Sequence, residues 1–171
     1  MIEAVYHVRH PREVVPLACA LACRCAQPEL VAAGLAELIT NGIEHGNLDI
    51  GFARKRDWLA CGDFERQRDR RIAALGAREH SVCVSVANCA ELVRFRVRDQ
   101  GRGFDWEPWL RFDDSRAGAP NGRGIALARA ACFASLYYIG SGNVVEAVAL
   151  RDAARPRCAP GDPGHTAAAR C

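Results

Sequence analysis

The sequence is poor in aromatic residues and in long apolar runs, and it holds one lysine against 22 arginines. Aromatic side chains make up only 7% of the 171 residues. The longest mainly apolar run covers residues 14–22, whereas a helix needs about 20 apolar residues to span a bilayer. The first ten residues also lack the apolar stretch of a secretory signal peptide. These absences argue against a membrane span and against export, so we expect a cytoplasmic protein.

The composition that is present is typical of one packed domain. Half of the residues are hydrophobic, and 23 basic side chains stand against 20 acidic ones, for a net charge of +3. This net charge is too small to require nucleic acid as a partner. We expect residues 1–150 to form the domain. Residues 151–171 are rich in Pro, Gly, Ala and Arg, and we expect a disordered C-terminal tail there.

Nine cysteines are present, an odd number at irregular spacing. Without an export signal, this pattern does not indicate a secreted disulfide framework. Cys19, Cys23 and Cys25 are close enough in sequence to suggest a metal site, but no second cluster stands at ligand spacing from them. We interpret the cysteines mainly as small buried apolar residues, with the metal site as the alternative.

The spacing of apolar residues predicts helices first and strands afterwards. A short strand over residues 4–9 precedes helices over 13–25 and 28–45, and Gly46 with Asn47 is expected to close the second helix. The later elements are strands over 81–87, 91–99, 136–139 and 144–150 and a helix over 125–132. This order predicts an α+β fold, a two-layer sandwich with helices on one face of a mixed or antiparallel sheet.

A charged stretch, residues 53–80, separates the first helices from the later strands. It holds eight basic and five acidic residues. Phe64, Ile72 and Leu75 are spaced as on one face of an amphipathic helix that packs on the domain. Because acids alternate with the bases, a solvated, ion-paired helix is favoured over a nucleic-acid surface. We expect neither nucleic acid nor a membrane as a partner.

One stripe of the helix predicted over 28–45 combines three functional groups. Glu37, Asn41 and His45 stand four residues apart and therefore share one face. A carboxylate, a carboxamide and an imidazole in this arrangement could hold a hydrated divalent cation and position a water or hydroxyl. Mg²⁺ suits such a stripe because it takes few protein oxygens beside phosphates and waters. A solvated helix face explains the pattern equally well.

Two glycine-containing motifs follow further along the chain. Asp99 ends a strand and precedes Gly101 and Gly103, which allow close approach of the backbone. Its carboxylate can accept a hydrogen bond from an exocyclic amine such as that of adenine. The string Asn-Gly-Arg-Gly at 121–124 leads into a helix whose first N–H groups can bind phosphate. The Asp-Gly motif at 99–103 would also occur in an ordinary turn, and the string at 121–124 would also occur at a flexible helix start.

In this order, the three elements together resemble the motifs of the GHKL, or Bergerat-fold, ATP-binding superfamily. The string from Glu37 to Asn41 resembles its N-box, 99–103 its G1 box and 121–125 its G2 box. Residues 104–121 stand where the ATP lid of that family lies.

The resemblance covers roughly residues 4–150. The string Glu-His-Gly-Asn at 44–47, with the G2-like string, indicates one branch of the superfamily. This branch holds the bacterial anti-sigma-factor serine kinases and the ATPase domains of sporulation-type phosphatases and response regulators.

The resemblance implies a role for each motif. Glu37 would be the catalytic base toward a water or a partner's serine hydroxyl. Asn41 would hold Mg²⁺ against the phosphates of ATP, and Asp99 would bind the adenine amino group. The other nucleotide-binding residues implied are His45, Gly101, Gly103, Gly122, Arg123 and Gly124. For contact with the terminal phosphate, the sequence leaves a choice among Arg111, Arg116 and Arg123.

By this resemblance the protein would be an ATP- and Mg²⁺-dependent serine/threonine kinase in bacterial signal transduction. Its partner would be a small regulatory protein, of the sigma-factor or anti-sigma-antagonist type. The alternative is a non-catalytic module that binds ATP and docks a partner, which the extra stretch 53–80 favours. A complete sensor histidine kinase fits less well, because only 36 residues precede Glu37. The sequence leaves a homodimer open.

Overall fold

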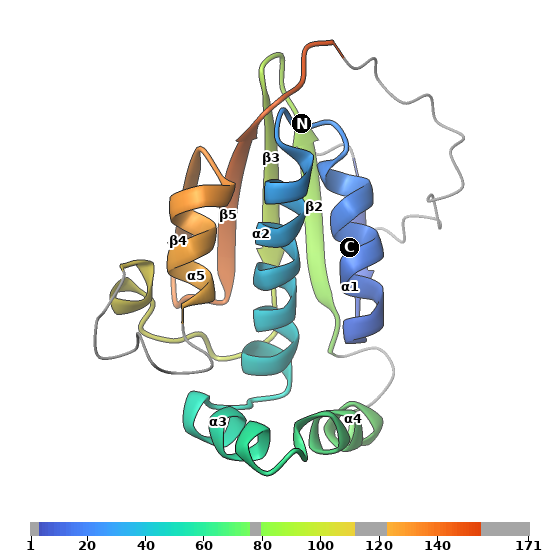
Figure 1. Ribbon diagram of the computed structural model, residues 1–171, viewed down its shortest axis with the longest axis vertical. Helices are drawn as coiled ribbons and strands as arrows, with labels where there is room; N and C mark the ends of the chain where they lie inside the picture. The colour runs from blue at the N-terminus through green and yellow to red at the C-terminus, as the bar shows by residue number, and fades with distance from the viewer. Residues whose placement is uncertain (1–3, 76–79, 112–122, 155–171) are drawn as a thin grey trace.

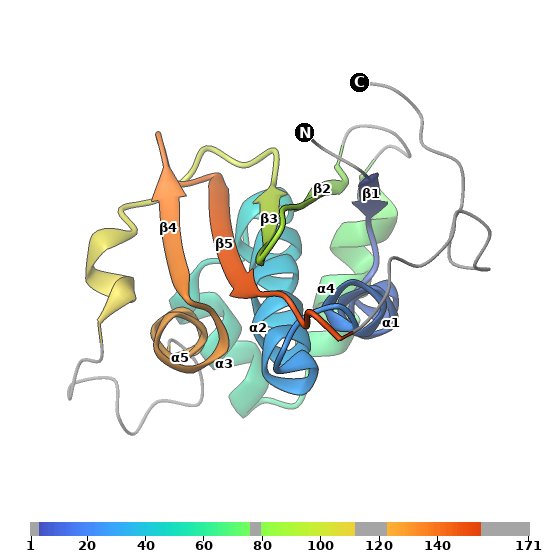
Figure 2. The same cartoon turned by 90° about the horizontal axis from the view of Figure 1, so that it is seen from above.

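The computed structural model describes residues 4–75, 80–111 and 123–154. In these residues, helices α1 (Pro11–Ala22), α2 (Pro28–Asn41) and α5 (Gly124–Leu127) lie together on one face of a single sheet (Figure 1). The strands are β1 (Ala4–Val8), β2 (Val82–Asn88), β3 (Leu92–Arg98), β4 (Ser135–Ile139) and β5 (Val144–Leu150). Figure 2 shows the helices as one layer and the strands as the other. The predicted α+β sandwich is therefore confirmed.

The sheet is antiparallel throughout its described strands. Its strand order is β1-β2-β3-β5-β4, and each neighbouring pair is antiparallel. In β3 the side chains of Val93, Phe95 and Val97 are buried and those of Arg94 and Arg96 are exposed, as the alternation of the sequence predicts. The buried set faces α2, whose own apolar side chains complete the core of the domain.

The helix predicted over 28–45 changes its geometry at Asn41. The chain is α-helical to that residue and continues as a wider π-helical turn, η1 (Gly42–Asn47). The residue after the turn, Leu48, donates its N–H to the carbonyl of Ile43 at 2.9 Å. The predicted closure at Gly46 and Asn47 is thus wrong, because both residues belong to the π turn.

Tertiary contacts explain why the helix does not stop where its glycine stands. The side chain of Asn47 accepts the N–H of Gln100 at 2.7 Å and donates to the carbonyl of His80 at 2.9 Å. These two hydrogen bonds join η1 to the segments before β2 and after β3. An inserted residue in a helix is common at functional sites, where it redirects the following side chains.

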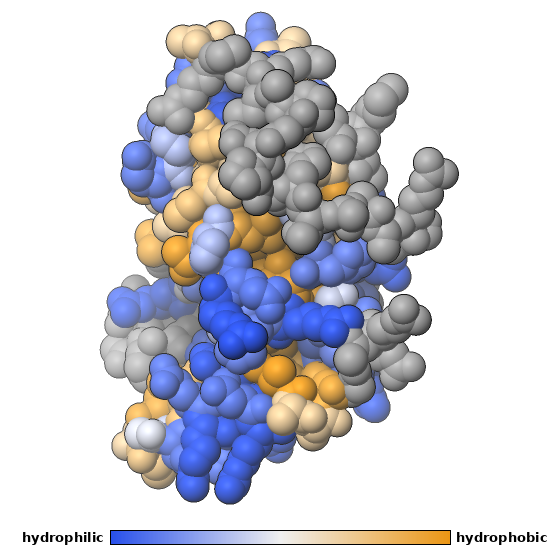
Figure 3. Space-filling model, turned by 90° about the vertical axis from the view of Figure 1, so that its right-hand side faces the viewer, coloured by the Kyte–Doolittle hydropathy of each residue, from blue (hydrophilic) through white to orange (hydrophobic). Residues whose placement is uncertain are grey.

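The charged stretch folds as a pair of helices, α3 (Phe52–Ala60) and α4 (Phe64–Ala74). The expected amphipathic helix corresponds to α4, whose Phe64 is buried, whereas α3 is not distinguished by the sequence pattern. The pair lies beyond the end of α2 (Figure 1). Figure 3 views the molecule from the side of α1 and α4, and its lowest part, where α4 lies, is mainly hydrophilic. Residues 76–79 of the stretch lie outside the described residues.

The helix predicted over 125–132 begins one residue earlier, as α5, and ends in a second π-helical turn, η4 (Ala128–Cys132). The preceding loop contains a 3-10 turn, η2 (Glu107–Leu110). Past β5, Arg151 pairs with Cys25 in an isolated β-bridge. Of the predicted C-terminal tail, residues 155–171 lie outside the described residues. No helix in the described part of the chain is long and apolar enough to cross a membrane.

Candidate functional site

A pocket of about 900 Å³ opens beside the C-terminal half of α2. Its walls come from α2 and η1, from the start of α3, from the loop after β3, from α5 and from the turn between β4 and β5. This volume lies within the range of pockets that hold small molecules and cofactors, about 300–1,000 Å³. Segments far apart in the sequence therefore meet around one cavity.

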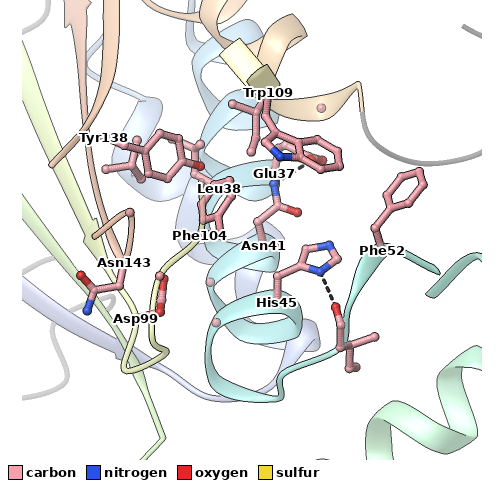
Figure 4. Close-up of a pocket in the computed structure, with 18 of the residues that line it drawn as sticks. Glu37, Leu38, Asn41, His45, Phe52, Asp99, Phe104, Trp109, Tyr138 and Asn143 are labelled. Carbon is pink, nitrogen blue, oxygen red and sulfur yellow. Dashed lines mark hydrogen bonds between the residues drawn. The ribbon is translucent and has the colours of Figure 1, made fainter. Parts of the chain in front are cut away.

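The stripe predicted on α2 forms one wall of this pocket. Glu37, Asn41 and His45 all line it, and Figure 4 shows them one above the other along the helix. The Asn41 amide donates from Nδ2 to Oε1 of Glu37 at 2.9 Å. This hydrogen bond directs the amide oxygen of Asn41 away from Glu37 and leaves Oε2 of Glu37 as the second acceptor of that carboxylate. The stripe therefore forms a wall of the cavity, and of its three residues only His45 is exposed.

His45 is held by the backbone of the segment that follows η1. Its Nδ1 donates to the carbonyl oxygen of Ile50, which fixes the proton on that nitrogen because a carbonyl can only accept. Desolvation by the pocket wall, together with the nearby Lys55 cation, lowers the pKa of His45. The imidazole is therefore neutral at neutral pH and offers Nε2 as an acceptor.

Asp99 reaches the pocket from the end of β3. Its Oδ1 accepts the N–H of Gly101 at 2.8 Å, and desolvation raises the pKa of the carboxyl group to about 6. The carboxylate lies directly against the π turn, since a Cβ placed on Gly46 would be 2.3 Å from Cγ of Asp99. Gly46 is thus required for close approach between η1 and β3, a role that its position in the sequence did not reveal.

Gly124 also stands in close contact with Glu37, the predicted base. A Cβ at this position would lie 1.7 Å from Oε1 of Glu37, so the first residue of α5 packs directly on the carboxylate. Gly103 and Arg123 also line the pocket, and Gly101 packs against the backbone of Gly46.

The remaining predicted positions divide into two groups. Gly122, Arg116 and the lid-like residues 112–121 lie outside the described residues. Of the two described arginines proposed for a terminal phosphate, Arg123 lines the pocket and Arg111 does not. The structure therefore favours Arg123 of these two.

Several pocket residues were not predicted as binding residues, although Phe104 and Trp109 lie in the stretch 104–121 that was expected to form the ATP lid. Phe104 and Tyr138 form an edge-to-face aromatic pair with ring centroids 5.2 Å apart, and Phe52 pairs with Trp109 at 5.6 Å. All four of these aromatic residues line the pocket, and so does Lys55. The one signal that marks Lys55 in the sequence is its being the only lysine.

The side chains in the described part of the chain do not form a metal site by themselves. Within residues 4–75, 80–111 and 123–154, no group of three His, Cys, Asp or Glu side chains is placed to hold a metal ion. The alternative of a metal site at Cys19, Cys23 and Cys25 is thereby not supported. The oxygen of Asn41 fits Mg²⁺, which takes one or two protein oxygens when substrate phosphates and waters supply the rest.

No protein-family model matches this sequence, and no curated protein matches it either. The function is therefore inferred from the motifs and from the geometry of the pocket.

Proposed function

We propose that this protein has a Bergerat-type fold, binds ATP with Mg²⁺ in the pocket beside α2, and transfers the terminal phosphate to a serine or threonine of a small regulatory protein. The anti-sigma-factor kinases that the sequence resembles act in this way. The partner would be of the sigma-factor or anti-sigma-antagonist type.

One observation carries the proposal. Glu37, Asn41 and Asp99 arise from the N-box-like and G1-box-like strings, and the three side chains line one cavity of about 900 Å³. If these strings formed only an ordinary Asp-Gly turn and a solvated helix face, their side chains would not be expected to line the same cavity. The volume is also adequate for a nucleotide.

At the sheet side of the pocket, Asp99 would accept a hydrogen bond from the adenine amino group. Its carboxylate must be ionised to act only as an acceptor, and its raised pKa of about 6 leaves it ionised at neutral pH. Phe104 and Tyr138 line the same cavity and offer apolar surface to a planar base.

At the α2 wall, the amide oxygen of Asn41 would hold Mg²⁺, which neutralises charge on the phosphates when bound. Glu37 would orient the attacking hydroxyl and take its proton. Because Oε1 of Glu37 already accepts the Asn41 amide, the hydroxyl proton would go to Oε2. The Asn41 amide thus both holds the base in place and belongs to the cation site.

A second function is favoured by the contact between Glu37 and Gly124. The start of α5 covers Oε1 of the carboxylate so closely that no Cβ fits between them. Only Oε2 is left to take a proton, and a protein that binds ATP and docks a partner without turnover needs neither oxygen as a base. Nucleotide binding without transfer to any partner would support this alternative.

The test is calorimetric titration with ATP and with ADP, in the presence and absence of Mg²⁺, followed by transfer of labelled phosphate to candidate partner proteins. Glu37→Gln is expected to retain ATP binding and abolish transfer, because the amide cannot take a proton. Glu29→Gln is the matched control, since Glu29 is exposed on the same helix. Undiminished transfer by Glu37→Gln would remove Glu37 as the base, and absence of ATP binding by the wild type would refute the proposal.

A further inference from the structure

Lys55 brings a cation from the α3–α4 pair into the pocket. It lies on α3, lines the cavity, and has a side chain that is only 17% exposed. Its Nζ donates to Oε2 of Glu44 at 2.6 Å. An ammonium group has three N–H donors, so this contact leaves donors for a second acceptor.

The ion pair of Lys55 and Glu44 is largely buried. Glu44 projects from η1 with its side chain 3% exposed, and Nη1 of Arg68 stands 3.9 Å from its Oε1. Arg68 also pairs with Asp69, whose Oδ1 lies 3.2 Å from its Nε, so the four side chains together carry no net charge. An anion that binds next to Lys55 would cost little in desolvation of the ammonium group, because this group is already largely removed from water.

The charges of the pocket wall limit where phosphates can lie. Among the described lining residues, the carboxylates are Glu37, Asp49, Asp99 and Asp105, whereas the cations are Lys55 and Arg123. His45 adds no charge, since its pKa is lowered. A polyphosphate is repelled by the carboxylates unless a cation accompanies it, so the two basic residues mark the favourable places.

The position of α3 agrees with this assignment. Figure 4 shows Asp99 on one side of Asn41 and His45, and Phe52, which begins α3, on the other. A nucleotide whose base contacts Asp99 would extend its phosphates past Asn41 toward α3.

The attachment of the helix pair does not depend on Lys55 alone. Arg71 on α4 donates to the carbonyl of Leu48 at 2.7 Å, and its guanidinium lies 5.5 Å from the ring centre of Trp58. Arg71 therefore gives the helix pair an attachment to η1 besides the ion pair of Lys55 with Glu44.

We propose that Lys55 binds the terminal phosphates of the nucleotide, so that the α3–α4 pair forms the polyphosphate subsite of this pocket. The inference rests on the proposed ATP binding and extends it to a segment outside the motifs that the sequence shares with the superfamily. Lys55 would share its ammonium group between Glu44 and a phosphate oxygen through charge-assisted hydrogen bonds.

The test compares the affinity for ATP, measured by calorimetry with Mg²⁺, with that for adenosine, measured by NMR titration. Lys55→Gln is expected to weaken ATP binding about ten-fold or more and to leave adenosine binding unchanged. Glu44→Gln removes the competing charge but keeps an acceptor, so ATP affinity is expected to be retained or increased. Arg56→Gln is the control, since Arg56 is exposed on the same helix.

A second measurement avoids substitution altogether. Because the chain has one lysine, labelling lysine with ¹³C at Cε gives a single NMR signal from the wild-type protein. ATP and inorganic tripolyphosphate are expected to shift this signal, and adenosine is not.

The outcomes separate the two proposals. ATP affinity unchanged in Lys55→Gln, with an unmoved lysine signal, would overturn the assignment of Lys55 and leave ATP binding intact. Equal losses of ATP and adenosine binding in Lys55→Gln and Glu44→Gln would show that the ion pair only supports the fold, which also overturns it. A wild-type protein that binds no ATP would overturn both proposals.

Discussion

Gly46 and Asp99 are in direct contact across the base of the pocket. A side chain on Gly46 would place its Cβ 2.3 Å from Cγ of Asp99, so the π turn and the end of β3 can approach only because residue 46 has no side chain. The contact sets the position of the carboxylate that we assign to adenine. Its consequences can be measured on stability and on binding.

Gly46→Ala is expected to force η1 and Asp99 apart. The displacement should lower the free energy of unfolding by about 1–3 kcal/mol, the usual cost of overpacking, and weaken ATP binding at least about ten-fold. Urea unfolding and calorimetry measure the two effects. Gly51→Ala is the control for the unfolding measurement, because no atom lies within 4 Å of a Cβ there. Equal behaviour of the two variants would contradict the role of the contact.

The affinity for ATP should depend on pH through Asp99. Desolvation raises the pKa of this group to about 6, and only the ionised form acts purely as an acceptor. Affinity is therefore expected to be constant above about pH 7 and to fall up to about ten-fold by about pH 5, where roughly a tenth of the group is ionised. Calorimetry across this range should show the fall in the wild type and in the control Asp57→Asn, whose side chain is exposed. A flat profile would argue against Asp99 as the adenine acceptor.

Asp99→Asn is expected to weaken ATP binding and to increase the stability of the fold. A carboxyl group whose pKa is raised on folding contributes stability below its unfolded value that is lost as pH rises through about 6. Replacing it by a neutral amide is consequently expected to raise the free energy of unfolding at about pH 8. After allowance for solvent screening of this half-buried group, the gain should be on the order of 1 kcal/mol, and smaller at about pH 5. A destabilised variant at alkaline pH would contradict the cause assigned to the raised pKa.

Glu146 lies on the face of the sheet away from the helices. In contrast to Asp99, its ionised carboxylate is expected to stabilise the fold at neutral pH. Burial alone would raise the pKa of this carboxyl, but hydrogen bonds from Tyr137 and Arg96 more than offset it, and the net pKa is lowered. Both Nε and Nη2 of Arg96 donate to its Oε2, at 3.1 and 2.8 Å. The stability from this cluster is present at neutral pH and is lost as pH falls into the range where the carboxylate takes up a proton.

Glu146→Gln is therefore expected to lower the free energy of unfolding by about 1–3 kcal/mol at neutral pH, with a smaller difference in acid. Urea unfolding at several pH values measures it, with the exposed Glu91→Gln as the control. A loss that does not shrink in acid would mean that packing, and not charge, holds Glu146.

Local patterns were sufficient to predict much of this molecule. The alternation of Val93, Phe95 and Val97 with arginines determined which face of β3 is buried, because side chains of a strand point alternately to its two faces. The four-residue spacing of Glu37, Asn41 and His45 likewise determined that they share one face of their helix. Both conclusions depend only on the geometry of a single element.

Tertiary structure alone decided the features that depend on contacts between elements. The continuation of α2 into a π turn follows from the hydrogen bonds of Asn47 to His80 and Gln100, which no local pattern encodes. Contacts between elements also decided the antiparallel order of the sheet, the approach of Asp99 to Gly46 and the placement of Lys55 in the pocket wall. The sequence by itself determined which side chains point the same way within each element, since backbone geometry repeats every few residues. Which of these faces meet was decided by packing, because that depends on how the whole chain buries its apolar surface.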